Sequence, residues 1–366
     1  PGAEGDAEGS PPVTVSGTAV ICCYTLDRWD RLVDAVASVR AQQPPVDAVV
    51  VVDHNEALLT AAQEAFPDLV VVPNGEGRGL SGARNTGVAC SDTDVVLFLD
   101  DDAVAEPSWA ASLLACFADP RVMVVGGRVD PDWEGGARPR WFPAEFGWVV
   151  GCSYTGQPER LGTVRNPIGA SMAIRRDVFA AVGGFSGALG RVGSLPVGCE
   201  ETELCIRLLR RDPEVVVLHQ PDSRVTHAVP EQRQTPRYFL SRCFHEGRSK
   251  AAVTRRHGSG SSLGSEARYV RRVLPLALWR YAVAALRGAP APGPAVREEP
   301  TAAPGAASGR RLAALGAALF VVLGLALVTT GFVVEHVTAA VTRRDREPAY
   351  ELVRRAPAPP AGVPTR

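Results

Sequence analysis

The sequence VVLFLDDD, residues 95–102, decides the predicted fold class. Five apolar residues run directly into Asp100, Asp101 and Asp102. A continuous apolar run of this length predicts a strand buried on both faces, and ligands bind beyond the carboxyl ends of such strands in open α/β sheets. Dense carboxylates are typical ligands of Mg²⁺ or Mn²⁺, so the run indicates a metal site. An acidic loop that merely ends a strand is the alternative.

Three further apolar strands precede this one, at 18–25, 47–52 and 69–72. Helical patterns at 30–41, 56–65 and 82–90 separate the four strands. This alternation predicts an α/β fold with a mostly parallel, right-handed wound sheet and helices on both faces.

The loop Gly77-Arg78-Gly79-Leu80-Ser81-Gly82 offers a different interpretation, because it fits G-x-G-x-x-G and Asp100 follows at the expected distance. That pattern is typical of NAD-type oxidoreductases. Three points count against it. The loop follows the third strand rather than the first, the helix after it is short and interrupted by Gly87, and the next strand ends in three acids where ribose binding needs one.

A second acidic centre lies at Glu200 and Glu201, at the start of a helical apolar pattern. Acids there are stabilised by the helix dipole, and simple capping would explain them if they stood alone. A metal site combined with a separate carboxylate is, however, what metal-assisted group transfer with a general base requires. His227 follows a late strand at 215–218. A lone histidine is more often structural, but imidazole can join carboxylates on Mn²⁺.

The segment 130–165 is irregular and holds three of the six tryptophans, Trp148 among them. Its aromatic rings would either stack on a sugar or cap the core, and the sequence favours neither. The following segment, 166–174, is a predicted strand that contains Gly169 and Ala170.

The C-terminal part predicts membrane attachment. Residues 312–334 carry no charge and are long enough to span a bilayer, and Arg310-Arg311 before them favours a cytoplasmic N-terminal side. The run 273–286 is too short to span and is typical of an interfacial helix. The predicted domains are listed in order: a disordered tail at 1–17, a catalytic domain at 18–255, an interfacial helical segment at 256–287, a linker at 288–309, a transmembrane helix at 310–336 and a disordered tail at 337–366.

Composition limits the partners and the compartment. The net charge of −1 gives no global field that would attract nucleic acid. The eight cysteines form no Cys-x-x-Cys pair and several lie in apolar patterns, which indicates reduced residues in a cytosolic compartment.

Together these motifs resemble family 2 glycosyltransferases with the GT-A fold over residues 18–255. The shared pattern is the opening strand, a strand ending in Asp53, Arg84 in a GARN element, Asp100–Asp102 as Asp-x-Asp, the Gly169-Ala170 segment and the acidic pair. The segments VDHN, GCEETELCIRL and FHEGRSKA resemble sequences of the branch of glucosyl-dolichyl-phosphate glucuronosyltransferases and their actinobacterial relatives.

The resemblance implies a role for each site residue. Asp53 would accept a hydrogen bond from a uracil ring, and Asp100 and Asp102 would hold the ribose and the divalent metal, Mn²⁺ or Mg²⁺. His227 would approach the metal, and Glu201 would be the general base. Of the remaining implied residues, Tyr24, Arg84 and Asp101 would lie at the nucleotide sugar, and Trp148, Gly169, Ala170 and Glu200 would line the donor and acceptor pocket.

The resemblance also implies an inverting transfer from a UDP-sugar, UDP-glucuronate or UDP-hexose, to a lipid-linked or glycan acceptor at the cell membrane. The protein would be single-pass, with its catalytic domain in the cytoplasm. Two departures stand out: the usual acidic pair is Glu-Asp rather than Glu200-Glu201, and the Gln-x-x-Arg-Trp motif of processive synthases is missing. A non-catalytic sugar-binding module on the same fold is a further alternative.

Overall fold

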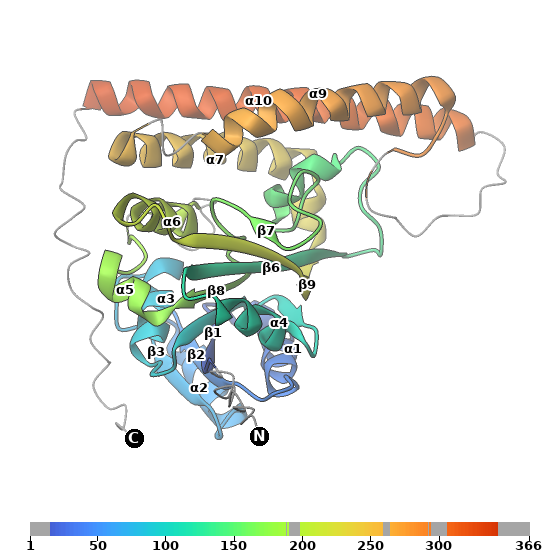
Figure 1. The fold of residues 1–366 in the computed structure, drawn as a ribbon. Helices are drawn as coiled ribbons and strands as arrows, with labels where there is room; N and C mark the ends of the chain where they lie inside the picture. The colour runs from blue at the N-terminus through green and yellow to red at the C-terminus, as the bar shows by residue number, and fades with distance from the viewer. Residues whose placement is uncertain are drawn as a thin grey trace, which may run out of the picture.

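A computed structural model describes residues 15–187, 189, 198–258, 264–291, 293 and 306–342. Most of the predicted tails at 1–17 and 337–366, and most of the predicted linker, lie outside these residues, whereas 337–342 belong to a helix. The described chain forms a nine-stranded sheet covered by helices, with a separate layer of C-terminal helices on one side (Figure 1).

The first half of the sheet is parallel and confirms the predicted α/β fold. Its strands are β1 (Gly17–Cys23), β2 (Asp47–Val52), β3 (Val70–Pro73) and β4 (Val95–Asp100), in the order β3-β2-β1-β4. Its helices are α1 (Trp29–Arg40), α2 (Glu56–Ala65) and α3 (Leu80–Ala89). Along β4, Leu97 joins one core cluster and Val96 the other, so β4 is buried on both faces as its apolar run predicts.

The second half of the sheet is mixed. β8 (Ser171–Arg175) runs antiparallel between β4 and β6 (Val122–Trp133), and β6 is parallel to β9 (Val216–Val229). Two short strands, β5 (Ala103–Ala105) and β7 (Gly162–Thr163), pair antiparallel with β9. β6 and β9 extend well beyond the predicted 122–125 and 215–218. Mutual pairing stabilises their polar second halves, which no local apolar pattern reveals.

Shorter helices connect these strands. They are α4 (Trp109–Ala115), α5 (Arg176–Val182) and α6 (Glu200–Arg211), together with 3-10 turns at Leu26–Arg28, Cys116–Ala118, Ala144–Val150 and Glu231–Gln234.

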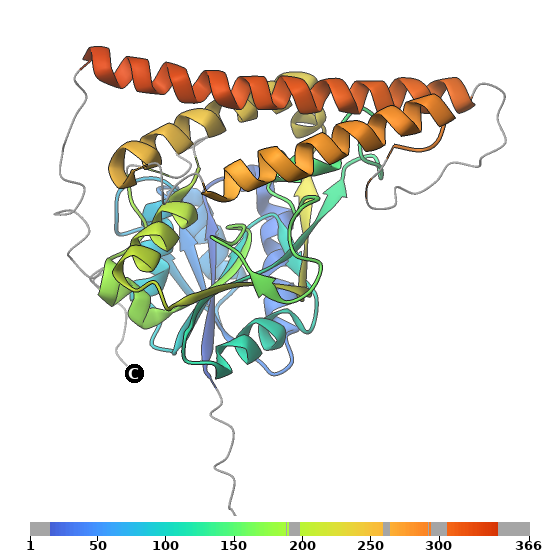
Figure 2. The same ribbon diagram turned by 45° about the horizontal axis from the view of Figure 1, so that its top comes forward.

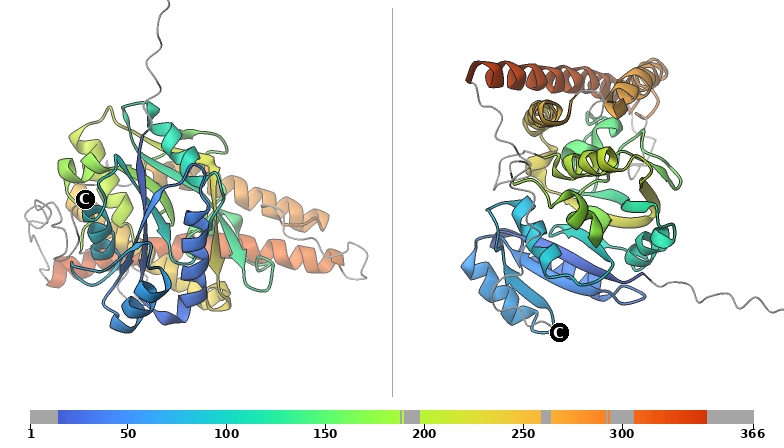
Figure 3. Two further views of the ribbon diagram at one scale, coloured as in Figure 1. Left: turned by 90° about the horizontal axis from the view of Figure 1, so that it is seen from below. Right: turned by 60° about the vertical axis from the view of Figure 1, so that its left-hand side comes forward.

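Three long helices form the C-terminal layer: α7 (Pro236–His257), α9 (Gly264–Arg287) and α10 (Ala306–Thr342). Figure 1 and the right-hand view of Figure 3 show α9 and α10 at the opposite end of the molecule from α2 and β3. Within the described residues, one helix is long and apolar enough to cross a membrane, at Ala307–Val341. α10 is longer than the predicted helix at 310–336, and α9 is longer than the predicted apolar run at 273–286.

The aromatic segment after β6 joins this layer to the sheet. Trp141, Phe142 and Phe146 pack with Phe239 of α7, and the ring of Phe320 on α10 lies 4.3 Å from that of Trp141. Phe142 and Phe146 are buried. These three rings therefore cap the core. Of the two roles considered for the aromatic residues of 130–165, sugar stacking or capping of the core, these three have the second.

Candidate active site

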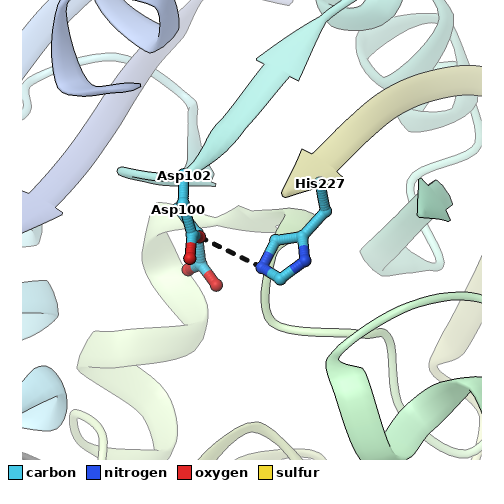
Figure 4. Close-up of side chains that lie close together, drawn as sticks. All are labelled: Asp100, Asp102 and His227. Atoms are coloured by element: carbon cyan, nitrogen blue, oxygen red, sulfur yellow. Dashed lines mark ion pairs between the residues drawn. The ribbon is translucent and has the colours of Figure 1, made fainter. Parts of the chain in front are cut away.

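An acidic cluster with one histidine lies at the carboxyl end of β4 (Figure 4). Asp100, Asp102 and His227 each offer one ligand atom, and these atoms all lie within 4.8 Å of one another. The His227 Nε2 atom is 3.0 Å from Asp102 Oδ1. Two carboxylates and an imidazole are a donor set that suits Mn²⁺ and also accepts Mg²⁺. Asp100 thus belongs with the two predicted metal ligands.

Sheet pairing brings His227 to this cluster from more than a hundred residues away. β5 directly follows the three aspartates, and Ala103 pairs with His227 across β5 and β9. Gly151, with φ of +82°, lies against the imidazole: a Cβ atom there would be 3.3 Å from His227 Cε1. A glycine at this turn therefore leaves room for the imidazole ring of His227.

Two arginines that no motif marks neutralise the acids. Arg28 lies 2.8 Å from Asp101 Oδ1 and 3.2 Å from Asp102 Oδ2, and Arg233 lies 3.5 Å from the same Asp102 atom. Both arginines come from short 3-10 turns, Leu26–Arg28 and Glu231–Gln234, that only the tertiary fold places beside the cluster.

The pKa values of Asp101 and Asp102 are shifted in opposite directions. Burial, together with the neighbouring Asp102 charge, raises the pKa of Asp101 to about 7. Burial acts in the same direction on Asp102, but His227 and the two arginines outweigh it and lower the pKa of Asp102. Burial alone would lower the pKa of His227, whereas Asp102 raises it to about 10. Because imidazole binds a metal through an unprotonated nitrogen, loading this cluster would release a proton.

Arg84 connects the metal cluster to the second acidic centre. Its buried guanidinium donates hydrogen bonds to Asp100 Oδ1 (3.3 Å), Glu200 Oε1 (2.9 Å) and the Gly169 carbonyl oxygen (3.0 Å). A Cβ atom on Gly169 would stand 2.9 Å from Arg84 Nη2. The Gly169-Ala170 segment therefore leaves room for the arginine that links β4 to α6.

The two predicted acids of α6 have different surroundings. Both line the cavity described below, but Glu200 is buried and paired with Arg84, whereas Glu201 has no arginine partner among the ion pairs of the described residues. Burial and the adjacent Glu200 charge raise the pKa of Glu201 to about 8. A carboxylate with this pKa is suited to accept a proton near neutral pH.

Asp53, at the end of β2, organises the glycine-rich loop. Its Oδ1 accepts from Asn74 Nδ2 (2.7 Å) and its Oδ2 from the Gly79 backbone N–H (3.0 Å). Gly79 has φ of +120°, and a Cβ atom on Gly82 would lie 2.0 Å from the Gly77 carbonyl oxygen. The glycines of this loop therefore allow it to fold tightly around Asp53, which accounts for its match to G-x-G-x-x-G. The Gly79 N–H donates to a carboxylate and is not free to bind a phosphate, as the dinucleotide-binding interpretation would require.

Tyr24 lies at the same carboxyl edge of the sheet, one residue after β1. Its side chain is 40% exposed, and the Arg28 guanidinium lies 5.4 Å from the ring centroid. The exposed ring is available to a ligand at the sheet edge.

A cavity of about 1010 Å³ runs from this edge to the C-terminal helices. Seven predicted site residues line it: Arg84, Asp100, Trp148, Gly169, Ala170, Glu200 and Glu201. The other five are not among its lining residues: Tyr24, Asp53, Asp101, Asp102 and His227. The cavity is also lined by Arg165 and Lys250, which each pair with Glu266 at 2.6 Å.

The C-terminal helices add apolar residues to the cavity lining: Val270, Val273 and Leu274 of α9 and Leu325, Val328 and Phe332 of α10. α9 also contributes the charged residues Glu266, Arg268 and Arg272. The cavity therefore combines acidic residues near the metal-competent cluster with apolar side chains of two helices.

Comparison with known proteins agrees with this arrangement. A family model described as glycosyl transferase family 2 matches residues 18–183. A glucosyl-dolichyl phosphate glucuronosyltransferase from Haloferax volcanii is 37% identical over 241 residues, which are 64% of this chain and 76% of that protein. The chain belongs to glycosyltransferase family 2.

Within the family, this glycosyltransferase belongs to the branch of the Haloferax protein. A pre-mycofactocin glycosyltransferase from Mycobacterium tuberculosis is 29% identical over 216 residues, 57% of this chain and 43% of that protein. A mannosyltransferase from Pyrobaculum calidifontis, solved in complex with GDP-Man and Mn²⁺, superposes with a TM-score of 0.53 at 18% identity and covers 92% of this chain and 91% of its own. That likeness confirms the GT-A fold.

Proposed function

We propose that this glycosyltransferase is an inverting, metal-dependent enzyme that moves a sugar from a UDP-sugar to a hydroxyl of a membrane-associated acceptor, of the polyprenyl-phosphate-linked class. One observation carries the proposal: a single cavity is lined by Asp100 of the metal-competent cluster, by Glu201 and by the apolar sides of α9 and α10. The cavity would thus bring together the metal-bound donor, a general base and apolar side chains that can contact a lipid.

The donor would bind at the carboxyl edge of the sheet. Asp53 accepts a hydrogen bond from the uracil ring, Tyr24 and Arg84 lie at the nucleotide, and Asp100 reaches the ribose or the diphosphate. Asp100, Asp102 and His227 would hold Mn²⁺ or Mg²⁺, which supplies positive charge for the diphosphate leaving group. Asp101, held by Arg28, keeps the acidic run in position.

Glu201 would accept the proton of the acceptor hydroxyl. The hydroxyl oxygen then forms a bond to the anomeric carbon while the bond from that carbon to the diphosphate oxygen breaks, so UDP leaves with the bonding electrons. Attack from the face opposite the diphosphate inverts the anomeric configuration. Glu200 and Gly169 fix Arg84 beside this path, and Trp148 offers a ring in the cavity wall for the sugar.

The Haloferax relative's name describes a glucosyl-dolichyl phosphate acceptor and a glucuronosyl donor. We propose substrates of the same chemical classes for this chain: a UDP-hexose or UDP-glucuronate as the donor, and an acceptor whose lipid lies along α9 and α10. The enzyme would act at the cell membrane, with its catalytic domain on the cytoplasmic side where UDP-sugars are found.

A panel of UDP-sugars with Mn²⁺ or Mg²⁺, scored by UDP release and by sugar transferred to extracted lipid, tests the proposal. At least one donor should support metal-stimulated UDP release, and Asp102→Ala and Glu201→Gln should each abolish transfer. Full activity in either variant contradicts the assigned roles. Donor binding without turnover in any combination would instead indicate a non-catalytic sugar-binding module.

A further inference from the structure

The apolar helix α10 contacts the rest of the protein at nearly every turn. Gly316 lies against Trp141, the Phe320 ring lies 5.3 Å from that of Phe239, and Gly324 lies against Phe146. Further along, Val328 meets Gly247 and Gly331 meets Phe244, both on α7. Buried positions along α10 are spaced by three, four, seven or eight residues, which keeps them on one face of the helix, at Ala314, Ala317, Val321, Gly324, Gly331 and Ala339.

The helix crossing with α7 is unusually close. A Cβ atom on Gly247 would stand 2.0 Å from the Val328 carbonyl oxygen, and one on Gly331 would stand 2.0 Å from the Phe244 carbonyl oxygen. Glycines on both helices thus let the two backbones touch. Beyond the crossing, Glu335 pairs with Arg248 (2.8 Å) and Arg255 (3.0 Å) of α7.

This docking conflicts with a helix that crosses a bilayer. The stripe from Ala314 to Ala339 is about 38 Å long at about 1.5 Å per residue, longer than the roughly 30 Å hydrocarbon core. If α10 crossed the membrane in this position, α7 with Arg248, Arg255 and the adjoining catalytic domain would have to enter the hydrocarbon with it. Burying those charges in lipid would be costly.

The outer faces of α9 and α10 are nevertheless suited to lipid. α10 exposes Leu312, Leu315, Leu319, Val322, Val333 and Val337, and α9 exposes Leu276, Leu286 and Trp279, whose side chain is 63% exposed. The two helices lie side by side on the same end of the molecule in Figures 1 and 2. An exposed tryptophan next to aliphatic residues is typical of a membrane interface.

Charge identifies the kind of surface that covers this face. Arg268, Arg271, Arg272, Arg280 and Arg287 of α9 and Arg311 of α10 are all exposed, whereas the acids of the two helices, Glu266 and Glu335, are engaged in ion pairs. Exposed arginines around an apolar face match anionic lipid headgroups.

We propose that α9 and α10 form a monotopic platform on an anionic lipid bilayer, in which α10 lies in the plane of the membrane surface instead of crossing it. The stripe that faces α7 stays on the catalytic domain, and the opposite face enters the lipid. In this arrangement both ends of α10 lie on the same side of the membrane.

The first test measures topology in the full chain. Epitope tags are added at both chain ends, the protein is expressed in bacterial inner membranes, and protease is applied to sealed vesicles of either orientation. Both tags should be cleaved in the same vesicle orientation and protected in the other. Cleavage of the two tags in opposite orientations overturns the proposal. The result does not depend on whether the protein transfers sugar.

The second test measures binding to vesicles of phosphatidylethanolamine and phosphatidylglycerol by flotation. The double variant Trp279→Ser/Leu319→Ser should bind at least tenfold more weakly than the unaltered chain. The matched variant Leu161→Ser/Val70→Ser, which removes two exposed apolar side chains elsewhere, should bind normally, and circular dichroism should show all three folded. Equal flotation of the two double variants contradicts the platform. A vesicle-free dimer that dissociates only in the first variant would show that a second copy covers this face, and would also contradict it.

Discussion

At the residue scale, the acidic pair at the start of α6 divides two tasks between adjacent side chains. Both line the cavity, but Glu200 is paired with Arg84, while Glu201 has a raised pKa. A single methylene distinguishes Glu201 from the aspartate usual at this place, and the structure still places Glu201 in the cavity wall. The sequence pattern named both residues but could not say which one is paired.

The pKa of Glu201 predicts the pH dependence of transfer. A base must be ionised, and the pKa of Glu201 is raised from its ordinary 4.5 to about 8. Below that pH the active fraction falls by about tenfold per pH unit. We therefore expect kcat/KM to rise from pH 6 to about pH 8 and then level off. Steady-state rates with saturating metal check this, and a profile already level at pH 6 would contradict it.

Arg84 should matter for stability as well as for the donor. Arg84→Met leaves the buried Glu200 without its partner, and loss of one partner of a buried ion pair costs about 3 kcal/mol. Urea unfolding measures the free energy of unfolding. The control is Arg40→Met, which removes a solvent-exposed pair with Asp68 and should cost under about 1 kcal/mol. Equal costs would show that Arg84 does not link β4 to α6 as described.

At the element scale, the turn that begins α3 depends on Gly82 but not on Gly77 of the same motif. A Cβ atom on Gly82 would lie 2.0 Å from the Gly77 carbonyl oxygen, whereas a Cβ atom on Gly77 would meet nothing within 4 Å. Gly82→Ala should therefore lower the free energy of unfolding by about 1–3 kcal/mol, and Gly77→Ala should change it little. Thermal unfolding of the two variants side by side checks this, and similar melting temperatures would contradict it.

Two glycines of α10, Gly331 at the crossing with α7 and Gly316 away from it, allow a second comparison of alanine substitutions. Gly331→Ala forces a Cβ atom against the Phe244 carbonyl oxygen, while Gly316→Ala places one in ordinary contact, 3.4 Å from Trp141 Cβ. We expect Gly331→Ala to loosen α10 and to speed hydrogen exchange in α7 and α10, with Gly316→Ala close to the unaltered protein. Exchange that is unchanged in Gly331→Ala would show that the two helices do not touch there.

The elements that the sequence predicted well are those with local signals. β1, β2 and β4 are continuous apolar runs, and α1 has a regular apolar face. The second halves of β6 and β9 escaped prediction because their stability comes from pairing with each other rather than from apolar content. The same reason hides Arg28 and Arg233: their charges meet the acidic run only after the sheet has formed.

At the scale of the whole molecule, the long cavity explains why acids and lipid-compatible helices belong to one protein. Asp100 at the end of β4 and Glu200 and Glu201 at the start of α6 line it together with apolar residues of α9 and α10. The apolar run at 312–334 predicted membrane attachment from composition alone. How the helix is oriented depends on its docking against α7, which composition does not encode.

The central claim is that Glu201 is the base of a metal-dependent sugar transfer from a UDP-sugar. The most direct measurement compares Glu201→Gln with the unaltered protein in two assays on the same preparation: UDP affinity with Mn²⁺ by calorimetry, and sugar transferred to extracted lipid. Loss of a positioned base typically costs about 10²- to 10⁴-fold in rate. We therefore expect equal UDP affinity and transfer reduced by at least a hundredfold; transfer within about twofold of the unaltered protein would contradict the account.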